Sequence, residues 1–254
     1  MSGAPNELRI IPVYFTDEIH AGDDLAEKLL GAMRRARVSL LAGDILIVKH
    51  KIVSKAEGRV VYLDSVQPSA HSRAWARRYK TDARVVELAL AQAKRVVRRK
   101  RGVLITETAS GLVSANSGVD VSNVDGGRHA LLLPVDPDRS AGRLHRAIRK
   151  AIGLAIPVII SDSVGRPWRE GLTEVAIGVA GMRALHDYRG RRDAHGYALK
   201  MSMEAVADEL AGAAGLVCGK LERVPACIVR GFAYERGRGS ARELIRPAAR
   251  DLFR

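Results

Sequence analysis

The sequence of 254 residues has few cysteines, few aromatic residues and no long apolar run. Its two cysteines, Cys218 and Cys227, lack the C-x-x-C spacing of metal sites and cannot form a framework of several disulfides. We interpret Cys227, which lies in the apolar segment PACIVRG, as a small buried hydrophobic residue. Phe, Trp and Tyr make up only 4% of the chain, so stacking surfaces for single-stranded nucleic acid are scarce.

The apolar runs are too short for a membrane span, which needs roughly 20 residues. The longest run, Leu154 to Ile160, is interrupted by Pro157. The N-terminus lacks the basic region and apolar stretch of a secretory signal, so we expect a cytoplasmic protein with no membrane partner. The pattern G-x-x-x-x-G-K-[ST] is also missing, which excludes the common P-loop nucleotide site.

Positive charge, by contrast, is abundant. The chain has 42 Lys and Arg residues against 28 Asp and Glu residues, a formal net charge of +14. This balance favours anionic partners, which include nucleic acid, membrane surfaces and small phosphorylated substrates. The densest run, Lys94 to Arg101, ends a predicted helix that Thr81 begins, and cations suit the carboxyl end of a helix. We favour this solvated helix end over a nucleic-acid-binding surface.

Apolar runs alternate with amphipathic stretches, which is typical of a mixed α/β protein. Asp23 is the predicted cap of the first helix, and a Ser240-x-x-Glu243 capping box predicts a final helix over 236–254. Further helices are predicted at 140–152 and 202–217. Buried strands are predicted at 45–48, 103–105, 130–133, 158–160 and 226–229. Because no linker or repeat divides the chain, we expect residues 1–254 to form a single domain, in which any two lobes are intimately packed.

Two segments combine turn-forming residues with polar groups. In 43–59, GDILIVKHKIVSKAEGR, a buried strand runs into lysines that can hold nucleotide phosphates, although a solvated connection explains the pattern equally well. In 114–127, SANSGVDVSNVDGG, Asn and Asp oxygens can converge on a hard cation such as Mg²⁺ or Mn²⁺. The alternative for this second segment is an ordinary turn that binds nothing.

A third segment, PVIISDSVGRPWREG at 157–171, places polar residues after a Val/Ile strand. The strand delivers Asp162 and Ser163 at its carboxyl end, where ligands usually bind in α/β proteins, and Gly165 lets the chain turn away. Arg166 and Arg169 can hold phosphate or carboxylate through bidentate hydrogen bonds. We therefore take Asp162, Arg166 and Arg169 as catalytic candidates in a metal-assisted phosphoryl transfer.

The strings GDILIVKHKIVSKAEGR, ANSGVDVSNV and SDSVGRPWREGLTEVAIGVAGMRALHDYRGRRDAHG resemble the coenzyme F420:glutamate ligase family in order and spacing. VADELAGAAGLV and VPACIVRG extend the similarity, which covers residues 9–235. The resemblance implies a mixed α/β fold of the family's own kind, neither Rossmann nor P-loop, in an intertwined homodimer. It also implies an enzyme that uses GTP as a co-substrate, together with two divalent ions, Mg²⁺ or Mn²⁺, and with K⁺. Such an enzyme joins L-glutamate to the carboxyl group of the deazaflavin precursor of coenzyme F420 through an acyl phosphate.

Carried over by position, the resemblance assigns metal ligands and nucleotide contacts. Asp120 and Asp162 would hold the metal, with Ser163 at a second ion. The implied nucleotide contacts are Thr16, Asp17, Glu18, Ile19, His50, Lys51, Lys55 and Asn123. His50 and Lys51 replace the small hydroxyl residues that are usual in the family, and Lys220 replaces a Glu or Gln. These departures leave open a paralogous ligase with a different anionic acceptor. A further alternative is a basic nucleic-acid-binding protein on the same scaffold that has lost catalysis.

Overall fold

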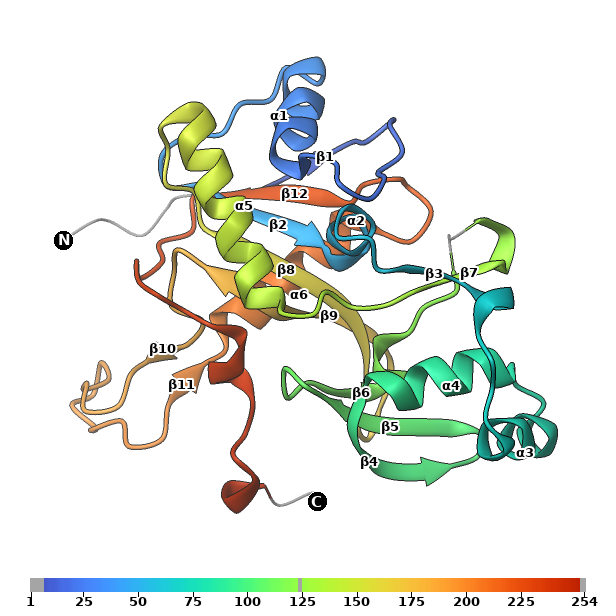
Figure 1. Cartoon of the computed structure of the whole chain (residues 1–254). Coiled ribbons are helices and arrows are strands. Elements are labelled where there is room, and N and C mark those ends of the chain that lie inside the picture. The colour runs from blue at the N-terminus through green and yellow to red at the C-terminus, as the bar shows by residue number, and fades with distance from the viewer. Residues whose placement is uncertain (1–6, 123–124, 252–254) are drawn as a thin grey trace.

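The computed structural model describes residues 7–122 and 125–251, which form a main body and a smaller lobe (Figure 1). The body is built on a five-stranded sheet in the order β1-β12-β2-β8-β9. These strands are β1 (Arg9–Val13), β2 (Ile45–Lys49), β8 (Val158–Arg166), β9 (Arg169–Ala180) and β12 (Ala226–Arg230). Within this sheet β2 and β8 are the parallel pair, and the other neighbours are antiparallel. The predicted mixed α/β class is confirmed, and the sheet is not that of a Rossmann domain.

Helices cover both faces of this sheet. Residues of α1 (Leu25–Arg35), α2 (His50–Ala56) and α5 (Pro137–Ile152) share one core, and those of α6 (Val206–Cys218) lie in the other. Leu46 and Val48 pack in the first core, whereas Ile45 and Ile47 pack in the second. This alternation explains why β2 reads as an uninterrupted apolar run. Cys227 is fully buried in the second core, as predicted.

The smaller lobe packs α3 (Ala70–Tyr79) and α4 (Ala83–Gln92) beside a three-stranded antiparallel sheet. Its strands are β4 (Ala93–Lys100), β5 (Val103–Thr108) and β6 (Val113–Ala115). Arg59 connects the lobes, because its Nε donates to the carbonyl of Leu133 at 2.9 Å and its guanidinium to Gln92 Oε1 at 2.6 Å. Two ribbons complete the strands: β3 (Val60–Tyr62) with β7 (His129–Leu131), and β10 (His186–Asp187) with β11 (Met203–Glu204).

The predicted helix from Thr81 through the run of cations is wrong in its second half. Asp82 caps α4 by accepting from Arg84 N at 2.8 Å, and the helix ends at Gln92. Residues 93–100 form β4 instead, which pairs with β5 and places Arg95 in an ion pair with Glu107 at 2.8 Å. Pairing with a neighbouring strand has overridden the local helical pattern. The cations therefore lie on the edge strand of this sheet, where charge discourages pairing with other sheets.

Helix termini differ from prediction elsewhere as well. The cap of α1 is Asp24, which accepts from Glu27 N, whereas Asp23 accepts from His20 N. The capping box at Ser240 is confirmed, but only 3₁₀ turns follow it. These turns are Ala241–Leu244 and Ala248–Arg250, so the predicted helix over 236–254 is wrong for the described part of this segment. Pro247 explains the stop, because its ring restricts the preceding residue to extended conformations. No helix in 7–122 or 125–251 has the length and apolarity to cross a bilayer.

Candidate functional site

The end of β2 determines where the candidate site lies. β2 pairs in parallel with β8 as far as Lys49 opposite Ser161, and the chain then turns directly into α2. β8 continues past this point, so Asp162 lies just beyond the last parallel pair. The prediction that the chain breaks away at Gly165 is wrong, because β8 runs on to Arg166 and returns as β9. Asp162 therefore faces the start of α2 from within a long hairpin.

His50, the first residue of α2, contacts Asp162. Its Nε2 lies 3.2 Å from Asp162 Oδ1, and its Nδ1 lies 3.4 Å from Ser54 Oγ. The imidazole is buried, and these two contacts hold it in place. Asp162 Oδ1 also accepts from Ser163 N at 2.7 Å, whereas Oδ2 has no partner within the described segments. One oxygen of Asp162 is thus left without a hydrogen bond or ion pair from the described residues.

Lys51, the next residue, contacts Asp120. Asp120 is fixed by paired backbone hydrogen bonds with Leu131, at 3.0 and 2.7 Å. Lys51 Nζ lies 2.7 Å from Asp120 Oδ2, and Ser122 N donates to Oδ1 at 2.7 Å. Burial alone would raise the pKa of Asp120, but the hydrogen bonds from Lys51 and Ser122 outweigh it and hold that pKa below its usual range. Asp120 is therefore a carboxylate stabilised in its charged form.

Lys49 forms the third pair, with Glu174 of β9. The two charged groups lie 2.5 Å apart and are almost fully buried. Glu174 also accepts from Ser161 Oγ at 2.9 Å and from Ser163 Oγ. Lys220, in the loop after α6, donates to Ser163 Oγ at 2.7 Å. Sequence reasoning missed Glu174, although a lone acid inside the apolar stretch LTEVAIGVA was a signal for it.

We call this arrangement the acid centre: Asp120, Asp162 and Glu174, each paired with one of the consecutive bases Lys51, His50 and Lys49. The acids come from three separate segments, and each contacts a different residue of one tripeptide at the junction of β2 and α2. Asp120, Asp162 and Ser163, the predicted metal ligands, all belong to it or contact it.

The family model described as F420-0:Gamma-glutamyl ligase matches residues 15–231. This chain belongs to that family. A protein named "Coenzyme F420:L-glutamate ligase" from Methanopyrus kandleri is 44% identical over the full length of both chains. Proteins of the same name from Methanothermobacter thermautotrophicus and Methanocaldococcus jannaschii are each 43% identical, over 93% and 84% of this chain and over 94% and 85% of their own. The family resemblance found in the sequence is confirmed, and so is the expectation that the protein is a ligase.

In this member of the gamma-glutamyl ligase family, three of the residues predicted to contact nucleotide, His50, Lys51 and Lys55, belong to α2. Residues 16–19 form part of the loop between β1 and α1, and Lys55 reaches this loop from α2. Lys55 Nζ lies 2.9 Å from Glu18 Oε2, and this hydrogen bond lowers the pKa of Glu18. The side chain of Ile19 is buried in the core. Asn123 lies outside the described residues, so its predicted contact is not placed.

Arg166 and Arg169 of this ligase flank the turn between β8 and β9. They are partners in the strand register, and Arg166 donates to the carbonyl of Glu170 at 2.8 Å. Arg166 is four residues beyond Asp162, about 13 Å along an extended strand. The structure does not place either arginine in contact with Asp162, so their catalytic roles stay predictions.

The oxygen chemistry of the acid centre suits a hard cation. Asp120, Asp162 and Ser163 offer carboxylate and hydroxyl oxygens, which Mg²⁺ and Mn²⁺ prefer. No three His, Cys, Asp or Glu side chains converge on one point among the residues that the structure describes. A metal ion here would therefore take further oxygens from water or from substrate, as Mg²⁺ commonly does.

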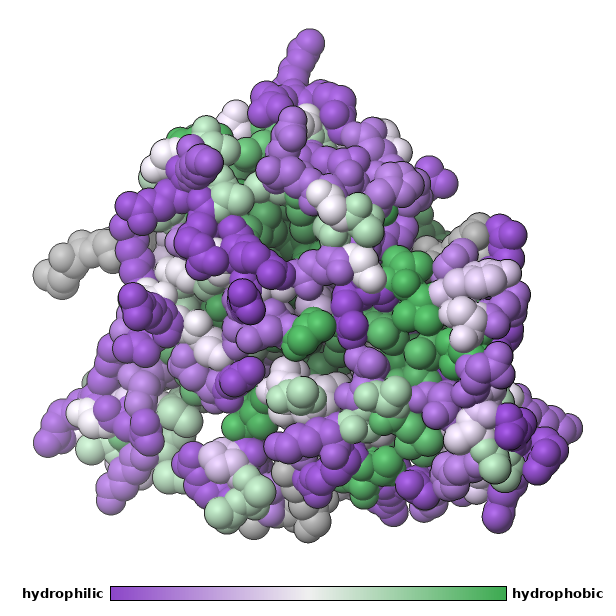
Figure 2. Space-filling model, viewed as in Figure 1, coloured by the Kyte–Doolittle hydropathy of each residue, from purple (hydrophilic) through white to green (hydrophobic). Residues whose placement is uncertain are grey.

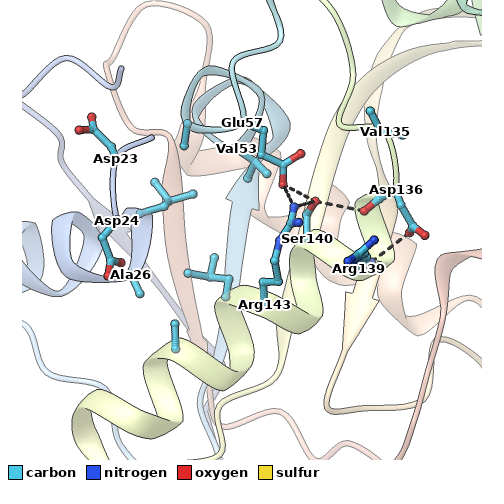
Figure 3. A pocket seen from close by; sticks show the side chains of 14 residues that line it. Asp23, Asp24, Ala26, Val53, Glu57, Val135, Asp136, Arg139, Ser140 and Arg143 are labelled. Atoms are coloured by element: carbon cyan, nitrogen blue, oxygen red, sulfur yellow. Dashed lines mark hydrogen bonds and ion pairs between the residues drawn. The ribbon is translucent and has the colours of Figure 1, made fainter. Parts of the chain in front are cut away.

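A cavity of about 500 Å³ lies on the other side of α2, between α1 and α5. Figure 3 shows its charged lining, where Arg143 pairs with Glu57 and contacts Ser140. In the space-filling view it is a recess with an apolar floor and a hydrophilic rim (Figure 2). None of the predicted site residues of this ligase lines it. The cavity and the acid centre are thus separate features that share α2.

Proposed function

We propose that this protein is a GTP- and divalent-metal-dependent ligase that joins L-glutamate to the carboxyl group of the deazaflavin precursor of coenzyme F420. The observation that carries the proposal is the 44% identity, over the full length of both chains, to a relative named "Coenzyme F420:L-glutamate ligase". The acid centre supports it, because carboxylates beside a cluster of cations suit the binding of a metal and of phosphate groups together.

In the proposed reaction, the γ-phosphoryl group of GTP passes to a carboxylate oxygen of the precursor, giving an acyl phosphate and GDP. The amine of glutamate then attacks the acyl carbon and loses a proton, and phosphate leaves. Asp120 and Asp162 would hold Mg²⁺ or Mn²⁺, with Ser163 at a second ion and K⁺ as an aid. A bound metal ion would offset the charge that builds up on the phosphoryl oxygens. Lys51 and Lys55 lie one turn apart on α2 and would bind the phosphates.

The proposal is tested with purified protein, GTP, Mn²⁺, L-glutamate and the deazaflavin precursor. Mass spectrometry should show the glutamylated precursor, together with GDP. Asp162→Asn should reduce turnover by about 100-fold or more, because it removes a carboxylate that would hold the metal ion acting on the phosphoryl group. Asp187→Asn, an exposed acid in the β10–β11 ribbon, is the matched control and should keep full activity. Full activity in Asp162→Asn would contradict the metal assignment.

A second candidate keeps the chemistry and changes the acceptor. The contact of Lys220 with Ser163 favours it, because a cation occupies a position next to a predicted metal ligand. Turnover of GTP with another anionic acceptor, and no product with the deazaflavin precursor, would identify this paralogous activity.

The proposal includes a homodimer, as the resemblance implies. The outer part of the β8–β9 hairpin carries exposed apolar side chains, and Trp168 and Leu172 are 79% and 62% exposed. Such surface is a candidate for burial against a second copy. Size-exclusion chromatography with light scattering should give twice the chain mass.

A further inference from the structure

The turn from Asp120 to Ser122 presents three oxygens to one cation, the ammonium group of Lys51. Lys51 Nζ lies 2.7 Å from Asp120 Oδ2, 3.0 Å from Ser122 Oγ and 3.3 Å from the Ser122 carbonyl oxygen. A lysine ammonium has three N–H donors, and these acceptors use all of them. The ammonium group is therefore coordinated much as a bound ion would be.

The same three oxygens are suitable ligands for a metal. Carboxylate, hydroxyl and backbone carbonyl are the groups that hard cations select. A divalent ion on Asp120 Oδ2 would lie where the positive charge of Lys51 now lies, and two cations at such close range repel strongly. Binding of one at this turn must therefore weaken binding of the other.

Among the three bases of the acid centre, Lys51 is best able to leave. His50 is 3% exposed and Lys49 is held in the buried pair with Glu174, whereas the side chain of Lys51 is 28% exposed. Its flexible four-carbon stem can carry the charge toward solvent. Lys220 contacts Ser163 instead, so it does not occupy the oxygens of the Asp120–Ser122 turn.

We propose that Lys51 competes with the divalent metal for the Asp120–Ser122 turn. In the metal-free protein its ammonium neutralises Asp120, and metal entry displaces it and makes it available to an anion. The inference rests on the proposed function, because that proposal assigns Asp120 to the metal. Lys51 thereby sets the metal affinity of the site, which a family member with a small hydroxyl residue at this position would not limit in the same way.

The test is a titration of the full-length protein with Mn²⁺, without nucleotide and at constant ionic strength. Electron paramagnetic resonance measures free Mn²⁺, and hence the dissociation constant. Lys51→Met should bind Mn²⁺ at least about tenfold more tightly than the unmodified protein. Lys51→Gln is a second neutral variant, in case the apolar one folds poorly, and circular dichroism checks both.

Lys28→Met is the matched control. Lys28 Nζ lies 3.0 Å from Asp23, its side chain is also 28% exposed, and its loss changes the net charge by the same amount. This variant should bind Mn²⁺ as the unmodified protein does. If Mn²⁺ binds tightly and its dissociation constant is unchanged by both Lys51 substitutions, or changes as much with Lys28→Met, the inference is overturned. The proposed function is then unaffected. Failure of every variant to bind Mn²⁺ overturns the inference together with the metal part of the proposed function.

Discussion

The buried pair of Lys49 and Glu174 should hold the acid centre together, and Glu174→Gln tests this directly. The side chains are 16% and 6% exposed, and their charges lie 2.5 Å apart. Glutamine keeps the shape and one acceptor oxygen, so the contact with Ser161 can persist, but the ammonium of Lys49 loses its counter-charge. Removing one partner of a buried ion pair costs about 3–5 kcal/mol, which is a large part of the stability of an ordinary protein.

A double-mutant cycle separates the cost of an unpaired buried charge from the cost of losing the contact between Lys49 and Glu174. Lys49→Met alone leaves Glu174 uncompensated and should cost a similar amount. Combining both changes removes both charges, so the double variant should be more stable than the sum predicts, by about 1–3 kcal/mol. Glu18→Gln is the comparison, because Glu18 is 74% exposed in its pair with Lys55 and should cost at most about 1 kcal/mol.

Urea unfolding followed by circular dichroism gives the free energy of unfolding of each variant. A cost for Glu174→Gln no larger than that for Glu18→Gln would refute the reasoning, since it would mean that Lys49 reaches water easily. Additive effects in the double variant would likewise show that the two charges do not depend on each other.

Two further predictions concern α6 and the strand it covers. A Cβ added at Gly215 would lie 2.9 Å from Glu174 Cγ, so Gly215→Ala should destabilise the protein by about 1–3 kcal/mol. Gly212→Ala, in the same helix with open space around it, should instead stabilise by up to about 1 kcal/mol, and equal melting shifts would contradict this. Burial raises the pKa of Asp208, so the folded state holds its proton more tightly than the unfolded state, and stability from this group falls as pH rises through the folded pKa. The stability of Asp208→Asn relative to the unmodified protein should therefore increase from pH 3 to pH 7. A difference in melting temperature between the two proteins that stays constant over this range would contradict the prediction.

The sequence predicted the strands whose buried residues form a continuous apolar run. The strand at 45–48 is an example, because both its faces are covered and each residue must be apolar. The sequence of α2 predicts a polar connection, since its seven residues are too few to indicate a helix on their own. The cation run at 94–101 misled for the opposite reason: its helical pattern is real, but pairing of β4 with β5 outweighs it.

For the acid centre, the sequence predicted members but not their partners. Asp120 and Asp162 were found from their surroundings and the family resemblance, whereas the bases that pair with them depend on where β2 stops and α2 begins. Glu174 lies eleven residues after Ser163 and meets it across a hairpin. That contact follows from strand register, which a turn at an unpredicted position determines.

The order of strands in the main sheet has a consequence for synthesis of the chain. β12, residues Ala226–Arg230, lies between β1 and β2, so the first and second strands of the sheet have no direct pairing with each other. During translation β1 has no strand partner in this sheet until β12 has been synthesised. Contacts between such distant segments make folding slow, and exposed strand edges promote aggregation in the meantime. We therefore expect nascent chains that end before β12 to depend on chaperones, because their main sheet cannot yet form.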